Sequence, residues 1–155
     1  MNNLKQYILE KLKINKDIKD NNYNYHPKDR SELKKLIDKL IKERGYDADL
    51  NDIDTSEITD MHSLFLCSRF NGDISKWNVS NVIDLYSMFR NSEFDGDLSK
   101  WNISNAKNTE MMFDGSKFTG KNGDISNWNI HNIENMNYMF DHCPLEKNPP
   151  KWYHE

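Results

Sequence analysis

The feature that most constrains the fold is a unit of about 24 residues that recurs from residue 46 onward. Residues 72–81 read GDISKWNVSN, and the same segment returns at 96–105 as GDLSKWNISN and at 123–132 as GDISNWNIHN. A second shared block follows each copy and ends in phenylalanine, with a divergent earlier version at residues 58–65. Because one such unit cannot bury its own apolar face, stacked copies are expected to share a core in which equivalent residues form columns.

The spacing of the aromatic residues predicts which residues form those columns. Tryptophans recur at intervals of 24, 27 and 24 residues, and the phenylalanines that end the second block recur at 24, 24 and 27. In both series the longer interval spans three extra residues near 119–121. The tryptophan at 152 therefore begins a last, unfinished copy. The expected structural core consists of Trp77, Trp101, Trp128, Phe65, Phe89, Phe113 and Phe140.

Within each unit the apolar pattern predicts a short strand followed by a short helix. Ile74, Trp77 and Val79 are expected to point inward from the strand. The apolar residues of 82–89 follow at i, i+3, i+6 and i+7, which is the spacing of a helix laid against the strands. The predicted fold class is therefore an α/β (α+β) solenoid of strand-plus-helix repeats with an N-terminal helical cap.

Three parts of the chain are expected. Residues 1–45 form a helical cap, with one amphipathic helix over residues 3–15 and a second whose apolar stripe covers residues 33–41 and which ends at Gly45. Residues 46–143 hold about four repeats, and residues 144–155 form a C-terminal capping tail in which Pro144, Pro149 and Pro150 stop further pairing. The helical part either only covers the end of the repeats or also binds a partner.

Charge and composition narrow the class of protein. Residues 1–45 hold 12 Lys and Arg against 7 Asp and Glu, whereas residues 46–155 hold 9 against 18, so a basic head precedes an acidic body. Such a body repels phosphate, which argues against direct nucleic-acid binding. No apolar stretch suits a membrane span, and the first residues lack the apolar core of a secretory signal. Cys67 and Cys143 show neither the spacing of a metal site nor that of a disulfide framework. A cytoplasmic protein is therefore expected.

The recurring anchors, such as Gly72, Asp73, Trp77 and Asn81, resemble the leucine-rich-repeat-like units of the BspA-like bacterial proteins. The resemblance covers about residues 50–143, and it implies a strand-plus-helix solenoid that binds other molecules rather than catalysing a reaction. Many members of that family are surface proteins, whereas a lipoprotein signal is missing here. Residues 4–12, together with the junction at residues 49–54, also look like the N-terminal block of short, signal-less bacterial and phage-associated versions.

Two faces of the repeats are candidates for partner binding. The outward positions of the expected strands form a polar ladder, in which the asparagines have either a binding or a structural role. These strand-face candidates are Lys76, Asn78, Lys100, Asn102, Asn127 and Asn129. The alternative, helix-face candidates are Asp84, Tyr86, Arg90, Glu110, Asp114 and Asp141.

No pattern in the sequence predicts catalysis, a metal or a cofactor. Phosphate-binding loops, dinucleotide fingerprints, nucleophile elbows and zinc-protease motifs are absent from the sequence. The five histidines fall at different places in the repeat, which argues against the remaining alternative, a hydrolase that uses His131 and nearby carboxylates. Asp73, Asp97 and Asp124 are expected to stabilise turns rather than to bind calcium.

The sequence therefore predicts a non-enzymatic module that recognises a protein partner through its repeats, without direct contact to nucleic acid or membrane. A narrower alternative is a phage- or mobile-element-encoded inhibitor of a bacterial defence complex, of the anti-CRISPR type. Its acidic body would block a nucleic-acid-binding channel of a host complex. The sequence leaves the oligomeric state open.

Overall fold

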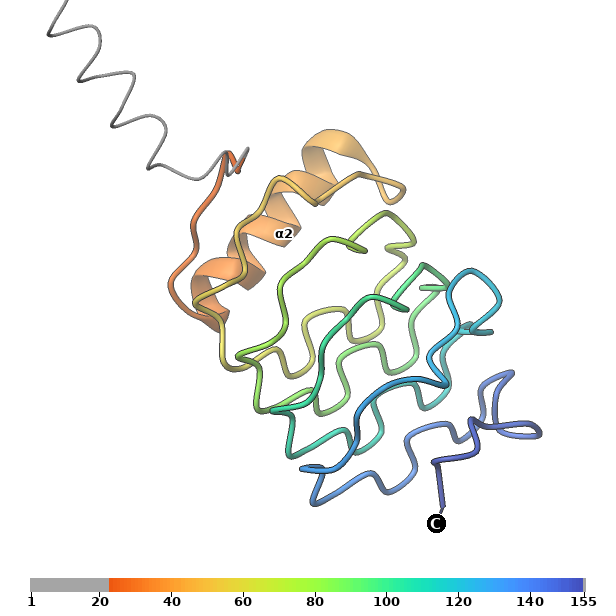
Figure 1. The fold of residues 1–155 in the computed structure, drawn as a ribbon. Helices are drawn as coiled ribbons and strands as arrows, with labels where there is room; N and C mark the ends of the chain where they lie inside the picture. The colour runs from red at the N-terminus through yellow and green to blue at the C-terminus, as the bar shows by residue number, and fades with distance from the viewer. Residues whose placement is uncertain (1–22, 155) are drawn as a thin grey trace, which may run out of the picture.

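The computed structural model describes residues 23–154. The expected helix over residues 3–15 lies outside this range. One regular element, the helix α2 (Arg30–Arg44), is formed within the described residues, and the repeats lie one behind another from it toward the C-terminus (Figure 1). None of the described helical residues forms a span long and apolar enough to cross a membrane.

Helix α2 has both of its ends defined by local chemistry. The Asp29 side chain accepts a hydrogen bond from the Glu32 amide at the N-terminus, as an N-cap does. At the other end Gly45 adopts a φ of 95°, and its amide donates to the Ile41 carbonyl. The stripe that faces the protein consists of Leu33, Ile37 and Leu40, all fully buried. The prediction of this helix and of its end at Gly45 is confirmed.

The predicted fold class is wrong. Among the described residues of the repeats there is no helix and no strand, so the chain does not form an α/β solenoid of strand-plus-helix, leucine-rich-repeat-like units. Instead, each repeat is a series of turns, and neighbouring repeats meet at isolated parallel bridges. These bridges pair Asp60 with Asp84, Asp84 with Asn108, and Asn108 with Asn135.

Left-handed residues explain why the expected helices do not form. Each repeat places two residues at positive φ, four positions apart, as Ser87 (51°) and Asn91 (54°) do in the second repeat. A left-handed L-residue interrupts a right-handed helix, so residues 82–89 turn instead of continuing as a helix. The equivalent residues of all four repeats are Ser63, Ser87, Met111 and Tyr138, and Cys67, Asn91, Gly115 and His142.

Short polar side chains stabilise the turns and interrupt the expected strands. In the second repeat the carboxylates of Asp73 and Asp84 and the amide oxygen of Asn78 each accept a hydrogen bond from the backbone amide two residues later, at 2.9–3.1 Å. The Ser92 hydroxyl does the same for Phe94 at 3.4 Å. Such local bonds compete with strands and helices, and here they mark four corners of the repeat.

A directional ladder of backbone hydrogen bonds joins successive repeats. The amides of Leu85, Ser87 and Phe89 donate to carbonyls of the third repeat, those of Asn108, Glu110 and Met112, each at 2.9 Å. Every second amide of this segment donates forward, and the pattern recurs between the other repeats. The repeats are therefore held side by side although no strand is formed.

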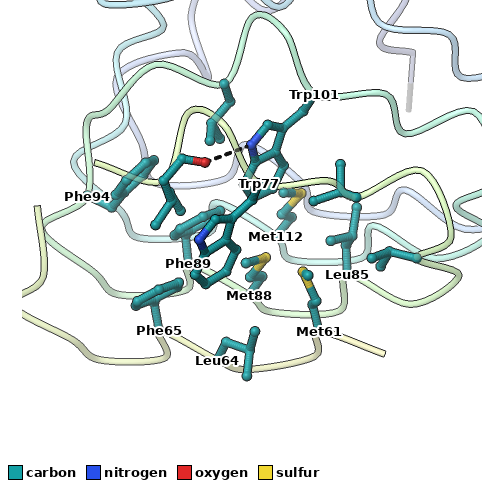
Figure 2. Packing of buried hydrophobic residues seen from close by; sticks show 14 of the residues in the cluster. Met61, Leu64, Phe65, Trp77, Leu85, Met88, Phe89, Phe94, Trp101 and Met112 are labelled. Carbon is teal, nitrogen blue, oxygen red and sulfur yellow. Dashed lines mark hydrogen bonds between the residues drawn. The ribbon is translucent and has the colours of Figure 1, made fainter. Parts of the chain in front are cut away.

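Aromatic columns fill the interior. Phe65, Phe89, Phe113 and Phe140 stack nearly parallel, with ring centroids 5.5–5.7 Å apart. Trp77 and Trp101 stack at 6.5 Å, and the indole N–H of Trp101 donates to the Ile74 carbonyl in the preceding repeat (Figure 2). All residues of the expected structural core, including Trp128, are buried.

The first repeat is covered by the segment that precedes it. Ile53 stands where the later repeats have tryptophan, and Tyr25 forms a parallel bridge to it. Arg30, at the start of α2, donates to the His62 carbonyl at 2.6 Å. Arg44, at its end, makes an ion pair with Asp52 that lowers the pKa of that carboxyl.

The last repeat is partly covered by the C-terminal tail. The Trp152 ring stacks on Trp128 at 6.3 Å, and its indole N–H donates to the Ile125 carbonyl, as in the preceding repeats. Tyr153 packs edge-on against Phe140, with ring centroids 5.0 Å apart.

Candidate functional site

The segments joined by the hydrogen-bond ladder present a broad outer surface, which we call the ladder face. Three outward positions of each repeat contribute to it, and none of the twelve side chains is buried. Because the ladder places the segments side by side, these side chains form three neighbouring columns. The columns are Asp60, Asp84, Asn108 and Asn135; His62, Tyr86, Glu110 and Asn137; and Leu66, Arg90, Asp114 and Asp141.

Part of the ladder face is organised by Asp114. Its carboxylate accepts a hydrogen bond from Arg90 Nε at 2.9 Å on one oxygen and lies 3.1 Å from His142 Nδ1 on the other. The side chain of Asp114 is only 13% exposed, so both partners keep its orientation fixed. The hydrogen bond to Asp114 raises the pKa of the exposed His142 imidazole above its ordinary value.

The structure brings the six helix-face candidates together, although no helix carries them. Asp84, Tyr86, Arg90, Glu110, Asp114 and Asp141 all lie on the ladder face. Glu110 accepts a hydrogen bond from the side-chain amide of Asn135 at 2.9 Å, which links the third and fourth repeats across the face. Their binding of a partner stays a prediction, and the structure shows that they share one surface.

The six strand-face candidates are exposed, and half of them have a structural role. Asn78, Asn102 and Asn129 each accept a hydrogen bond on the side-chain oxygen from the backbone amide two residues later, at 3.1 Å. The remaining three, Lys76, Lys100 and Asn127, are exposed beside them. This surface therefore carries similar side chains in each repeat, and one asparagine of each repeat is engaged in a turn.

A second set of asparagines was missed by the sequence analysis. The side-chain amides of Asn81, Asn105 and Asn132 donate to serine carbonyls of the preceding repeat at 2.6–2.8 Å. The sequence does mark these residues, because an asparagine ends each GDISKWNVSN-type segment at the same position of the repeat. Its constancy indicates a structural role between repeats.

One group of potential metal ligands was also missed. Ligand atoms of Asp60, His62 and Asp84 lie within 4.8 Å of one another, because the repeat brings Asp84 beside Asp60. His62 Nδ1 is hydrogen-bonded to Asp60 at 2.8 Å, and both side chains are about 40% exposed, so water competes for the same oxygens. This geometry permits a cation without requiring one.

The other chemically active residues occupy separate environments. Asp73, Asp97 and Asp124 each accept a backbone amide in a turn, and His131 lies at an exposed turn of the fourth repeat. Cys67 is exposed, whereas Cys143 is buried, and burial raises the pKa of its thiol.

Comparison with known proteins places the chain in a family. No curated protein and no solved structure shows significant similarity to it. Residues 32–152 match the family described as Mycoplasma protein of unknown function, DUF285. This match is broadly consistent with the expected BspA-like relationship, but it does not assign leucine-rich repeats. Because the match includes most of the residues in α2 and all of the repeats, the chain belongs to the DUF285 family.

Proposed function

We propose that the protein is a non-enzymatic module that binds a protein partner through the ladder face. The observation that supports this proposal is the contrast between the inner and outer columns. Inside, a column holds the same residue in every repeat, as the stacked phenylalanines do. Outside, one column reads His62, Tyr86, Glu110 and Asn137, so a regular backbone presents a non-repeating set of side chains. Repeat proteins use extended surfaces of this kind to recognise partners.

The charge of the ladder face indicates the kind of partner. Its twelve side chains include five carboxylates and one arginine, and that arginine is paired with Asp114. A basic protein surface would be complementary to this charge and would be steered toward it. Tyr86 adds an amphipathic ring of the type that is enriched at interface centres.

The test compares two matched double variants as baits. Tyr86→Ala with Glu110→Ala alters the ladder face, whereas Lys76→Ala with Lys100→Ala alters the other candidate surface. Partners that the native chain retains from a host lysate should be lost with the first variant and kept with the second. Far-ultraviolet circular dichroism checks that both variants fold. Equal retention by the ladder-face variant, or no protein retained by the native chain, would contradict the proposal.

The acidity of the same face supports the narrower alternative of a phage- or mobile-element-encoded inhibitor. In that case the ladder face would occupy a basic nucleic-acid channel in a bacterial defence complex of the CRISPR type, in competition with phosphate. The measurement is binding of labelled target nucleic acid by such a complex, with increasing amounts of the native chain or of the ladder-face variant. Loss of nucleic-acid binding that weakens with added salt is expected only for the native chain.

A further inference from the structure

The backbone ladder has a direction, and this gives the two ends of the repeat stack different chemistry. Between the third and fourth repeats, the amides of Thr109, Met111, Phe113 and Gly115 donate to carbonyls of residues 135, 137, 139 and 141 at 2.8–3.0 Å. The same direction holds between the earlier repeats. In this segment the alternate amides therefore face the C-terminal end, and the carbonyls that accept from the preceding repeat face the N-terminal end.

The fourth repeat leaves its forward amides without acceptors. Within residues 23–154, the equivalent amides of Met136, Tyr138, Phe140 and His142 donate to no protein group. The carbonyls of Met136, Tyr138 and Phe140 are engaged by amides three residues later. The left-handed conformation recurs at Tyr138 (58°) and His142 (54°), so the backbone has the form seen in the earlier repeats. The end opposite α2 (Figure 1) thus presents a row of four amide donors, which we call the donor edge. It begins two residues after Glu134, whose carbonyl corresponds to the Lys107 carbonyl that accepts from the following repeat.

A hollow of about 600 Å³ adjoins the donor edge. Phe140 belongs to both, Asp141 lies between two residues of the donor edge, and the rest of the lining comes from the tail: Glu146, Pro149, Tyr153 and His154. Phe140 packs on Phe113 on its inner side, whereas the tail contributes only tilted and edge-on rings at this point. The hollow offers space for a side chain beside the Phe140 position of the donor edge.

We propose that the donor edge docks a segment of another polypeptide whose alternate backbone carbonyls accept these four amides. The inner repeats show the required geometry, because four carbonyls spaced two residues apart satisfy the same four positions in each preceding interface. Main-chain pairing of this kind is a general mode of peptide recognition at an unpaired edge. The docked segment has the pattern of residues 107–115, with apolar side chains that face the hollow.

Other occupants fit the chemistry less well. Two donor edges cannot pair with each other, because both would present amides. At the acceptor end of a second copy, Arg30 of α2 already donates to the His62 carbonyl, so that end cannot supply all four acceptors. A small anion would meet the carboxylates of Asp141 and Glu146, which line the hollow, whereas neutral carbonyls would not be repelled by them.

The experiment is a titration of the ¹⁵N-labelled full chain, followed by amide chemical shifts and hydrogen exchange. The probe is an acetylated and amidated peptide with the sequence of residues 107–115, carrying E110Q and D114N to remove its carboxylates. Without the peptide, the amides of the donor edge should exchange faster than those of Thr109, Met111 and Phe113. Near saturation their exchange should slow by at least about tenfold, as expected for newly formed hydrogen bonds.

Two controls distinguish pairing at the donor edge from binding at another surface of the protein. Tyr138→Ala keeps the backbone donor, so its amides should still respond to the peptide. The double variant Tyr86→Ala, Glu110→Ala should also still respond, because the donor edge does not depend on the ladder face. Inorganic phosphate should leave the four amides unchanged. Slow exchange in the free protein, absence of a peptide response, or a response to phosphate alone would overturn the proposal.

Discussion

A glycine and alanine comparison at Tyr138 tests the backbone conformation of the repeats. Tyr138 lies within the segment whose apolar spacing predicts a helix, yet its φ is 58°. Its side chain is not required for packing, because the residue is 51% exposed. Tyr138→Gly and Tyr138→Ala both remove the ring, so the difference between them reports mainly on the backbone.

The two conformations predict opposite orders of stability. In the left-handed region an L-residue costs roughly 1–2 kcal/mol. Glycine avoids that cost but loses about 0.5–1 kcal/mol more conformational free energy on folding. Tyr138→Gly should therefore be more stable than Tyr138→Ala by about 0.5–1 kcal/mol. In a helix, alanine would be favoured by about 1 kcal/mol.

Urea unfolding followed by tryptophan fluorescence gives the free energies of unfolding of both variants. Lys39, an exposed residue of α2, provides the matched control, since Lys39→Ala should there be more stable than Lys39→Gly. The same order at Tyr138 as at Lys39 would refute the left-handed conformation.

Three further results are expected. Phe113→Ala removes a fully buried ring that stacks between Phe89 and Phe140, and should lower the free energy of unfolding in urea by about 3–5 kcal/mol. Ile83→Ala, at a half-exposed position, should lower it by less than about 1 kcal/mol. Similar losses for the two variants would contradict the buried columns. Trp101→Phe leaves the Ile74 carbonyl without its indole donor and should cost about 1–3 kcal/mol, so a neutral effect would show that this bond is not made. His142 should titrate above its ordinary pKa of 6.5, because its protonated form is hydrogen-bonded to Asp114. The stabilisation that results is present below pH 6.5 and is lost as the pH rises through the pKa of His142 in the folded protein. NMR of the imidazole should show that this pKa falls in Asp114→Asn. An unchanged pKa would contradict the contact between His142 and Asp114.

The sequence predicts the interior of this protein better than its backbone. Recurrence of tryptophan and phenylalanine at a constant interval identifies the buried columns, because stacked repeats place equivalent residues in contact. The helix α2 is predictable for another reason, since its apolar stripe and its final Gly45 are local signals.

The conformation of the repeats could not be predicted from apolar spacing. Residues at i, i+3 and i+7 face one side of a helix, but the turns of this repeat bury the same positions. The left-handed residues include Ser87, Met111 and Tyr138, which have no preference that would reveal them. The available signal was the polar residue at each corner, such as Asp84, whose side chain binds the amide of Tyr86.

The candidate surface was predictable in its residues but not in its geometry. The six helix-face candidates do share one face, because the repeat interval alone aligns them in columns. The contacts between repeats, such as Asp114 with Arg90 and His142, depend on how closely the turns approach. Apolar periodicity carries no information on that approach.

The most direct test of the account is NMR detection of scalar couplings across the backbone hydrogen bonds of the second repeat. Turns joined by a forward ladder predict couplings from the Ser87 amide to the Glu110 carbonyl and from the Phe89 amide to the Met112 carbonyl. A helix would instead couple the Ser87 amide to the carbonyl of Ile83 and the Phe89 amide to that of Leu85. Observation of the second pair would contradict the stacked-turn structure.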